Sequence, residues 1–506
     1  MSQIEFLTPL LLFILPFFFL FFFIKTCLTC NSSNKEPRSY PVLGSILTLL
    51  ANRERINQWV VELLHQHTPH ANGTIILHLS MGLRQVITTN PANVEHILKT
   101  QFYLYPKGDF FRHTLSDFLG NGIFNVDGEN WRFQRQLFSH EFNTKSLRKF
   151  VKTVVGNELS DCLLPLLSQA AAENTVFDLQ DILQRFAFDN ICKIAFGFDP
   201  ECLSPSFPQP KSEFAEAFEE ATRLSSERFT SMFTLIWKLK RALNIGSERR
   251  LRLAISQVRE FATKIIEEKK QEHKGKDLLS RILNSGHLDE GFVTDTVISF
   301  MLAGRDTTSA ALTWFFWLVS CNSHVEEEIL KEIMDKPKNL FDYDEVKDMV
   351  YTHASLCESM RLYPPIPSDT KFAVSDDVLP DGTVVKKGME VTYHPYAMGR
   401  MEVLWGKNWS EFWPERWLER EESMEKWRFV GRDPYTYPVF QAGPRVCLGK
   451  EMAFLQMKSI VAGVMREYQV VPAEMGFEPV FTSFLTSKMK GGFHVTIKKR
   501  SVGSGQ

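Results

Sequence analysis

The chain has 506 residues, of which 44% are hydrophobic and 42 are phenylalanine. This length allows a large buried core and excludes a small scaffold that depends on disulfides for stability. Its 58 basic and 60 acidic residues nearly cancel, so no global field favours nucleic acid or another polyanion as a partner.

The amino terminus predicts a membrane anchor. Residues 4–24 are almost wholly apolar, and Lys25 is the first basic residue of the chain. About 20 apolar residues in a helix span a bilayer, and basic flanks tend to stay in the cytoplasm. The alternative, a cleaved signal peptide, needs a basic start and a small-residue cleavage site, and neither is evident. We therefore expect residues 1–30 to be a single-pass anchor, residues 31–45 a polar linker, and the remaining chain to be cytosolic.

Residues 46–506 predict one mainly α-helical body with small β-sheets. Alternating patterns at 74–80 and 85–89 indicate a hairpin, and Asn90-Pro91 is typical of a helix start. Helical patterns dominate the middle of the chain, and short strands return towards its end. The expected helices include 130–138, 256–273 and 289–320, the expected late strands are 383–385 and 390–393, and a last hairpin should turn at 490–492.

The most distinctive motif is Phe440-Gln441-Ala442-Gly443-Pro444-Arg445-Val446-Cys447-Leu448-Gly449. Positive charge and a helix start lower the pKa of a cysteine; Arg445 would supply the charge, and residues 448–458 predict the helix. Gly443 and Gly449 permit tight turns and close approach to a flat macrocycle, and Phe440 can pack beside the sulfur. An isolated cysteine in a Gly-Pro turn is, by contrast, usually a structural thiol.

This ten-residue arrangement resembles the heme-binding signature of the cytochrome P-450 superfamily, Phe-x-x-Gly-x-Arg-x-Cys-x-Gly, at every fixed position. The resemblance implies the cytochrome P-450 fold and a heme-thiolate monooxygenase with heme b (iron protoporphyrin IX) as its cofactor. It makes Cys447 the iron ligand and places Phe440, Gly443 and Arg445 in the cofactor site. A thiolate ligand pushes electron density onto iron and favours O–O cleavage.

A second motif, Glu358-Ser359-Met360-Arg361, matches the Glu-x-x-Arg of the same superfamily. Residues three apart on a helix share a face and can pair, and Pro364 should end this helix. The segment 412–417 resembles the one whose arginine, here Arg416, joins the pair. The resemblance thus implies a buried structural network of Glu358, Arg361 and Arg416, although Glu-x-x-Arg alone is typical of solvated surface pairs.

Trp131 and Arg135 lie four residues apart in a helical pattern. The resemblance assigns both to the heme propionates, together with Arg445. A guanidinium suits this role because its geometry matches a carboxylate. The alternative is a packed tryptophan beside a surface arginine.

The segment Ala303-Gly304-Arg305-Asp306-Thr307-Thr308 resembles the Ala-Gly-x-Asp-Thr-Thr box of the superfamily. Ala303 and Thr307 share a helix face, and Gly304 would remove a side chain where dioxygen must fit. The resemblance makes Thr307 the residue that holds the oxygen species and water, and Asp306 the relay of protons from solvent, a general-acid role. A solvent-facing polar stripe is the alternative, and the apolar flanks weigh against it. A heme-thiolate isomerase or dehydratase is disfavoured because family members of that kind lack this threonine.

The segments 122–128, 302–311 and 396–400 resemble the plant fatty-acid ω-hydroxylase branch. That resemblance implies an apolar substrate whose terminal methyl group faces the iron, dioxygen, and electrons from an NADPH-cytochrome reductase at the endoplasmic reticulum membrane. A fatty acid, a jasmonate conjugate and the side-chain end of a sterol all remain open, as does a non-catalytic heme protein. The candidate lining residues are Ala303, Ile366 and Phe484. Lys107 and Arg112 would either bind a carboxylate or, as the simpler interpretation, be solvated loop charges.

Overall fold

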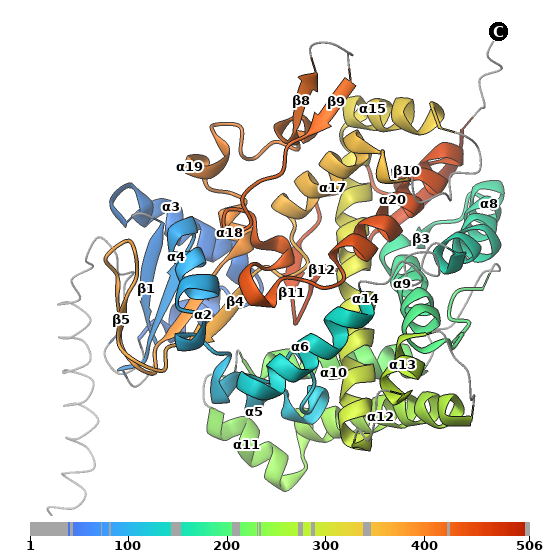
Figure 1. Ribbon diagram of the computed structural model, residues 1–506. Coiled ribbons are helices and arrows are strands. Elements are labelled where there is room, and N and C mark those ends of the chain that lie inside the picture. Colours follow the sequence, from blue (N-terminus) through green and yellow to red (C-terminus); the bar gives the residue numbers. More distant parts are fainter. Residues whose placement is uncertain are drawn as a thin grey trace, which may run out of the picture.

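The computed structural model describes residues 39–500 except 41–43, 72, 80–81, 143–152, 205–212, 230, 232–233, 272–276, 285–288, 337–345 and 422–425. This part of the chain is mainly helical, and a small sheet lies at one side of the helices (Figure 1). The predicted mainly α-helical class with small sheets is therefore confirmed. The predicted anchor, residues 1–30, lies outside the described residues. Among the helices that are described, none combines the length and apolarity needed to cross a bilayer.

The helices of the described chain surround one long central helix, α14 (Figure 1). Short 3-10 turns flank the sites discussed below, at Pro414–Trp417, Pro438–Phe440 and Gly443–Arg445. The α-helices are α2 (Ile46–Ala51), α3 (Ile56–Ala71), α4 (Pro91–Glu95), α5 (Gly108–Leu119), α6 (Gly128–Phe142), α8 (Leu164–Glu173), α9 (Leu179–Phe196), α10 (Glu213–Glu227), α11 (Thr234–Leu243), α12 (Gly246–Gln271), α13 (Leu278–Asn284), α14 (Glu290–Ser320), α15 (Ser323–Met334), α17 (Val350–Leu362), α18 (Pro395–Met398), α19 (Glu402–Trp405) and α20 (Lys450–Glu467).

The strands form small separate sheets. The largest has the order β1-β2-β7-β4, with β1 (Thr74–His78), β2 (Arg84–Thr88), β7 (Glu390–Tyr393) and β4 (Asp369–Phe372). A second has the order β10-β13-β3, with β10 (Tyr468–Pro472), β13 (His494–Lys499) and β3 (Phe177–Asp178). Three pairs complete the set: β5 (Asp377–Val378) with β6 (Val384–Val385), β8 (Leu418–Glu421) with β9 (Lys426–Phe429), and β11 (Phe481–Ser483) with β12 (Ser487–Met489).

Most predicted elements are present with small shifts of their ends. The first hairpin is confirmed by the antiparallel β1–β2 pair, and the late strands by β6 and β7. Asn90 caps α4 because its side-chain oxygen accepts a hydrogen bond from the Ala92 N–H at 2.9 Å. The helices predicted at 130–138, 256–273 and 289–320 correspond to α6, α12 and α14, and α17 ends at Leu362, before Pro364.

The predicted last hairpin at 490–492 is wrong. The strands on either side of this turn belong to different sheets, because β12 pairs with β11 and β13 pairs with β10. Gly492 has a φ of +87°, and a Cβ there would lie 2.3 Å from Asp178 Oδ2. The same carboxylate accepts a hydrogen bond from the Phe493 N–H at 2.8 Å. The glycine pair thus lets the chain dock on the start of α9, which a local pattern cannot reveal.

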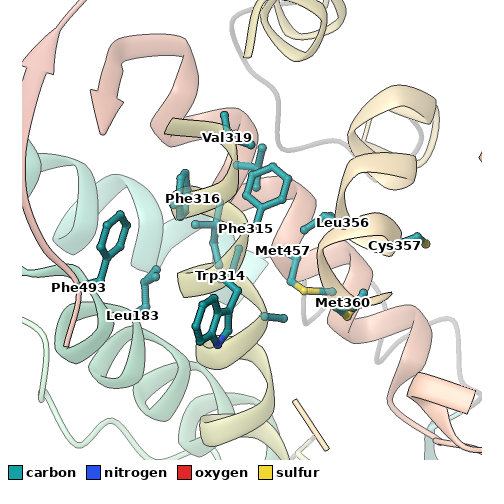
Figure 2. Packing of buried hydrophobic residues seen from close by; sticks show 14 of the residues in the cluster. Leu183, Trp314, Phe315, Phe316, Val319, Leu356, Cys357, Met360, Met457 and Phe493 are labelled. Atoms are coloured by element: carbon teal, nitrogen blue, oxygen red, sulfur yellow. The ribbon is translucent and has the colours of Figure 1, made fainter. Parts of the chain in front are cut away.

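Helix α14 is held from several sides by large apolar side chains. Figure 2 shows Trp314, Phe315 and Phe316 of α14 among Leu183, Met360 and Met457, which come from α9, α17 and α20. Trp314 also stacks on Tyr363 with ring centroids 4.0 Å apart. Because close-packed side chains resist displacement, α14 forms a rigid support for the residues one to three turns earlier, at 303–307.

Gly304 is where α9 comes closest to this part of α14. A Cβ at Gly304 would lie 2.5 Å from Ile191 Cγ1, a distance that requires the neighbouring side chain to move. Gly304 also lines the cavity described below, so the expectation that it makes room for dioxygen stays a prediction, and the close approach of α9 adds a second reason for a glycine here. The glycine is needed for helix packing.

We expect Gly304→Ala to lower the unfolding temperature, measured by circular dichroism, because overpacking costs about 1–3 kcal/mol. Adding Ile191→Ala should restore part of the loss, since it removes two of the three nearest atoms, Cγ1 and Cδ1. Gly431→Ala is the control, because its Cβ would meet only Phe429 at 3.7 Å. Equal unfolding temperatures for the Gly304 and Gly431 variants would show that the contact is unimportant.

Candidate active site

A cavity of about 1920 Å³ runs beside α14. Residues that are far apart in the sequence meet on its walls. The predicted site residues that line it are Trp131, Arg135, Ala303, Thr307, Ile366, Phe440, Arg445, Cys447 and Phe484. The other predicted site residues are not among the lining residues: Gly443, Asp306 and the structural residues Glu358, Arg361 and Arg416.

Cys447 opens onto this cavity from the segment 440–449, here called the Cys loop. Its N–H donates a hydrogen bond to the Phe440 carbonyl oxygen at 2.8 Å, which folds the loop back on itself. Burial raises the pKa of the Cys447 thiol, while the N–H groups of Gly449 and Lys450 and the charges of Arg135 and Lys450 act in the opposite direction. Helix α20 begins just after the cysteine, as expected. The supporting charge that the sequence assigned to Arg445 comes instead from Arg135 and Lys450.

Gly443 supports the Cys loop from outside the cavity. Its φ is +62°, and a Cβ there would lie 2.1 Å from the Leu98 carbonyl oxygen. The expected close approach of this glycine is thus to the backbone of Leu98. Gln441, also at a positive φ of 62°, donates a hydrogen bond to Asp369 Oδ2 at 3.0 Å. Both positions tie the loop to neighbouring segments.

Trp131, Arg135 and Arg445 lie together at the edge of the cavity. The Arg445 guanidinium carbon is 4.6 Å from the centroid of the Trp131 ring, and its Nη2 donates to Asp127 Oδ1 at 2.6 Å. Arg135 lies close enough to Cys447 for the two charges to interact, and burial lowers the pKa of its guanidinium. Arg135 has no hydrogen bond or ion pair with a carboxylate of the described chain, so this half-buried cation is available to an anionic ligand.

Lys107 is named from the sequence as either a carboxylate-binding residue or, as the simpler interpretation, a solvated loop charge. Its side chain is only 13% exposed and lines the cavity, so the expectation of a solvated loop charge is wrong. Burial lowers the pKa of Lys107 to about 7, and Asp369, at 3.9 Å, opposes this effect. No local pattern marks Lys107, because Asp369 comes from β4. Arg112, in contrast, forms a solvated pair with Asp109.

The face of α14 towards the cavity carries Ala303 and Thr307. Thr307 Oγ1 donates a hydrogen bond to the Ala303 carbonyl oxygen at 2.6 Å. Asp306 is 2% exposed and points elsewhere: its Oδ1 is 3.4 Å from Arg305 Nη1. The predicted pair of Asp306 and Thr307 is therefore divided between two sides of the helix.

The predicted ion network behind the Cys loop is present. Glu358 is 0% exposed and accepts hydrogen bonds from Arg361 Nε and Nη2, both at 2.8 Å, and from Arg416 Nε at 3.2 Å. Two partners were not predicted: the Trp417 Nε1–H at 2.8 Å and the Trp413 N–H at 3.1 Å. A buried carboxylate needs such a full set of donors.

These residues fit heme b. Cys447 offers a sulfur ligand to iron, the walls are largely apolar, and Lys107, Arg135 and Arg445 supply cations for two propionates. The unpaired guanidinium of Arg135 and the buried amine of Lys107 are side chains that an anionic group would stabilise. The fold and the site define a heme-thiolate protein.

Comparison with known proteins agrees. The family model described as Cytochrome P450 matches residues 35–495. Cytochrome P450 94A2 of Vicia sativa is 59% identical over 501 residues, which cover 96% of this chain and 96% of that protein. Cytochrome P450 94A1 of Vicia sativa is 58% identical, with 92% and 90% covered, and Cytochrome P450 94B3 of Arabidopsis thaliana is 48% identical, with 97% and 98% covered.

The chain therefore belongs to the cytochrome P450 family, and the resemblance to the plant branch is confirmed. Members of this family are monooxygenases that bind heme b through a cysteine thiolate, so heme b is the cofactor and the chain is an oxidoreductase. Such enzymes use dioxygen, a redox partner and apolar substrates.

We expect Glu358→Gln to destabilise the fold by about 3–5 kcal/mol, because it leaves buried arginine charges without their carboxylate. Heme content and thermal unfolding measure the effect. Glu419→Gln is the matched control, because its pair with Arg428 is more than half exposed on both sides. A Glu358 variant that is as stable as the control would rule out a supporting role for the network.

Proposed function

We propose that this cytochrome P450 hydroxylates the terminal carbon of a fatty acid or of a fatty-acid-derived chain. The observation that carries the proposal is that one largely apolar cavity reaches both Cys447 and the Ala303–Thr307 face of α14. Sites for apolar ligands have such walls with few polar groups. The side-chain end of a sterol and a jasmonate conjugate are competing substrates, which the experiment below distinguishes.

The shape of the wall supports a long, narrow substrate. Phe110 and Phe111 of α5 both pack against Phe229, with ring centroids 6.0 and 5.5 Å apart, and Phe110 also meets Phe372 at 6.2 Å. These rings line the cavity together with Ile366 and Phe484. An extended chain can lie along such a row of rings with its end near Thr307.

The mouth of the cavity supports a substrate with a polar end. Leu50 and Arg53 at the end of α2, and Leu83 and Arg84 at the start of β2, line the same cavity and are exposed. Helix α2 and strand β1 lie well apart from α20, which follows Cys447 (Figure 1). A carboxylate held by arginine at this mouth would leave the apolar end of the chain to face α14.

When bound, heme b supplies an iron that binds and activates dioxygen. In the proposed arrangement Cys447 holds the iron, Phe440 packs beside the sulfur, and Trp131, Arg135 and Arg445 hold the propionates. The Thr307 hydroxyl donates a hydrogen bond to the Ala303 carbonyl oxygen, so the lone pairs of Oγ1 can accept a hydrogen bond from water in the cavity.

Asp306 is proposed as the proton source behind α14. Its Oδ1 lacks a hydrogen-bond partner among the described residues, so water can donate a hydrogen bond to it. In the proposed role the carboxylate takes a proton from water on the solvent side and then, as a general acid, gives that proton to water on the cavity side. Because this carboxyl group faces away from the cavity, the transfer requires a water chain or a rotation of the side chain.

The proposal also covers the setting of the enzyme. Residues 1–30 would anchor it in the endoplasmic reticulum membrane as a single pass, with the heme domain in the cytosol. An NADPH-cytochrome reductase in the same membrane would supply the electrons.

The full chain, co-expressed with such a reductase in microsomes, should hydroxylate fatty acids in the range from lauric acid to oleic acid at their terminal carbon. The ω-hydroxy acids are measured by mass spectrometry with NADPH and dioxygen present. Cys447→Ser should abolish the product and the thiolate-type spectrum of the reduced carbon monoxide complex, because an alcohol is a poor iron ligand in place of a thiolate. Conversion of jasmonoyl conjugates or hydroxysterols in preference to fatty acids would replace the proposed substrate. Unchanged product and spectrum in the serine variant would refute the site.

We expect Thr307→Ala to lower product formation by about 10²-fold, the lower range for loss of a positioned proton-transfer group, while NADPH consumption continues. Thr307→Ser should keep most of the activity because it retains the hydroxyl. Thr294→Ala is the control: Thr294 makes the same hydrogen bond to the residue four positions earlier, at 2.9 Å, but on the exposed first turn of α14. Full coupling of NADPH to product in the alanine variant would exclude the proposed role.

A further inference from the structure

Two carboxylates stand behind the cations of the heme site, and neither belongs to a motif with an assigned role. Asp127 is the next-to-last residue of the segment 122–128, which resembles the plant branch, and Asp369 begins β4. Their side chains are 18% and 8% exposed. Asp127 connects the Cys loop to the segment that carries Lys107. Asp369 connects the same loop to the sheet that contains β4 and β7.

Asp127 joins three segments. Its Oδ1 accepts hydrogen bonds from Arg445 Nη2 at 2.6 Å and from the Lys107 N–H at 3.1 Å, and its Oδ2 accepts one from the Gly108 N–H at 3.2 Å. Helix α6, which carries Trp131 and Arg135, begins at the next residue. One carboxylate therefore sets the Cys loop, the start of α5 and the start of α6 relative to one another.

Asp369 makes the corresponding connection on the other side. Its Oδ2 accepts hydrogen bonds from Lys371 Nζ at 2.8 Å, from the Tyr393 hydroxyl at 2.8 Å and from Gln441 Nε2 at 3.0 Å. Its Oδ1 lies 3.9 Å from Lys107 Nζ. Burial alone would raise the pKa of Asp369, but the charges of Lys107 and Lys371 outweigh it and hold the pKa below its ordinary value. This carboxylate stays ionised.

The charges in this cluster do not cancel. Lys107, Lys371 and Arg445 interact with both carboxylates, and Arg135 interacts with Arg445. With every cation protonated, four cations against two carboxylates leave two positive charges. Because the pKa of Lys107 is lowered to about 7, its charge is complete only when an anion in the cavity keeps this amine protonated. The charge of a ferric porphyrin is cancelled by its thiolate ligand, so the two propionates are the charge that heme b adds.

We infer that Asp127 and Asp369 are positioning residues for the cofactor, which orient Lys107, Lys371 and Arg445 and limit the excess charge of the four cations to the two charges that the propionates neutralise. The inference rests on the proposed heme site and goes beyond it, because it assigns to two buried carboxylates the control of the electrostatic potential at the iron. Negative charge near a heme lowers the reduction potential, since it opposes the electron that arrives.

The test is the midpoint potential of the heme iron in the full-length, heme-loaded protein, measured by spectroelectrochemical titration. Asp127→Asn should raise the potential, because it removes one negative charge and keeps the shape of the side chain. Asp127→Glu keeps the charge, so its potential should stay near that of the parent. Adding Lys107→Met to Asp127→Asn restores the count of two excess charges and should bring the potential back towards the parent value.

Glu129→Gln is the matched control, because it removes the same negative charge two residues further along the chain. The Glu129 carboxylate pairs with Arg132 and is 80% exposed. Its potential should be unchanged. Should Asp127→Asn fail to retain heme, the double variant with Lys107→Met should regain it. The inference is overturned if Asp127→Asn has the same midpoint potential as Glu129→Gln. It is also overturned if adding Lys107→Met to Asp127→Asn reverses neither the change in potential nor the loss of heme.

Failure of this inference is distinguishable from failure of the heme site itself. If the parent protein shows the thiolate-type spectrum of its reduced carbon monoxide complex and only the potentials do not respond, the heme site stands and the role of the carboxylates falls. If the parent protein lacks that spectrum, the heme site fails first.

Discussion

The hydrogen-bond network around one buried carboxylate, Glu358, supports the Cys loop. Glu358 is 0% exposed, and Arg361, Arg416 and two tryptophans donate the hydrogen bonds that a buried carboxylate requires. The support continues from Trp417, whose ring lies 4.8 Å from that of Tyr437. The Tyr437 hydroxyl in turn donates to the Cys357 carbonyl oxygen at 2.9 Å. Phe440 and the Cys loop follow directly, so the position of Cys447 depends on a polar network several residues away.

The opposite wall is held by different forces. Helix α14 is fixed by apolar packing around Trp314 and by the close approach of α9 at Gly304 (Figure 2). Dispersion and burial are not directional, but close packing leaves few alternative positions. One wall that is fixed by directional hydrogen bonds therefore faces another that is fixed by shape. A cavity between two such walls can keep a constant width.

The segment 122–128 links the two walls. A Cβ at Gly120 or Gly122 would clash with Asp295 or Ser299 of α14, so this turn lies directly on the central helix. A few residues later, Asp127 binds Arg445 of the Cys loop. The segment thus connects the oxygen side of the cavity to the cysteine side.

Much of the fold and of the candidate site could be predicted. The helices α6, α12 and α14 and the first hairpin follow from periodicity and spacing, which are local properties, whereas the network around Glu358 is implied by the family resemblance. Three contacts could not be predicted in this way. Gly304 contacts Ile191, Gly443 contacts the backbone of Leu98, and Gly492 docks on Asp178; in each case the decisive neighbour is distant in the chain.

The sequence by itself determined the class of protein, because the Cys loop and the motifs at 303–308 and 358–361 consist of residue types at fixed spacing whose chemistry does not depend on the rest of the fold. Only the tertiary structure decided that Lys107 is buried, that Asp306 faces away from Thr307, and that Asp127 and Asp369 hold the cations of the site. The physical reason is that burial and charge pairing depend on which segments meet, and those segments come from opposite ends of the chain.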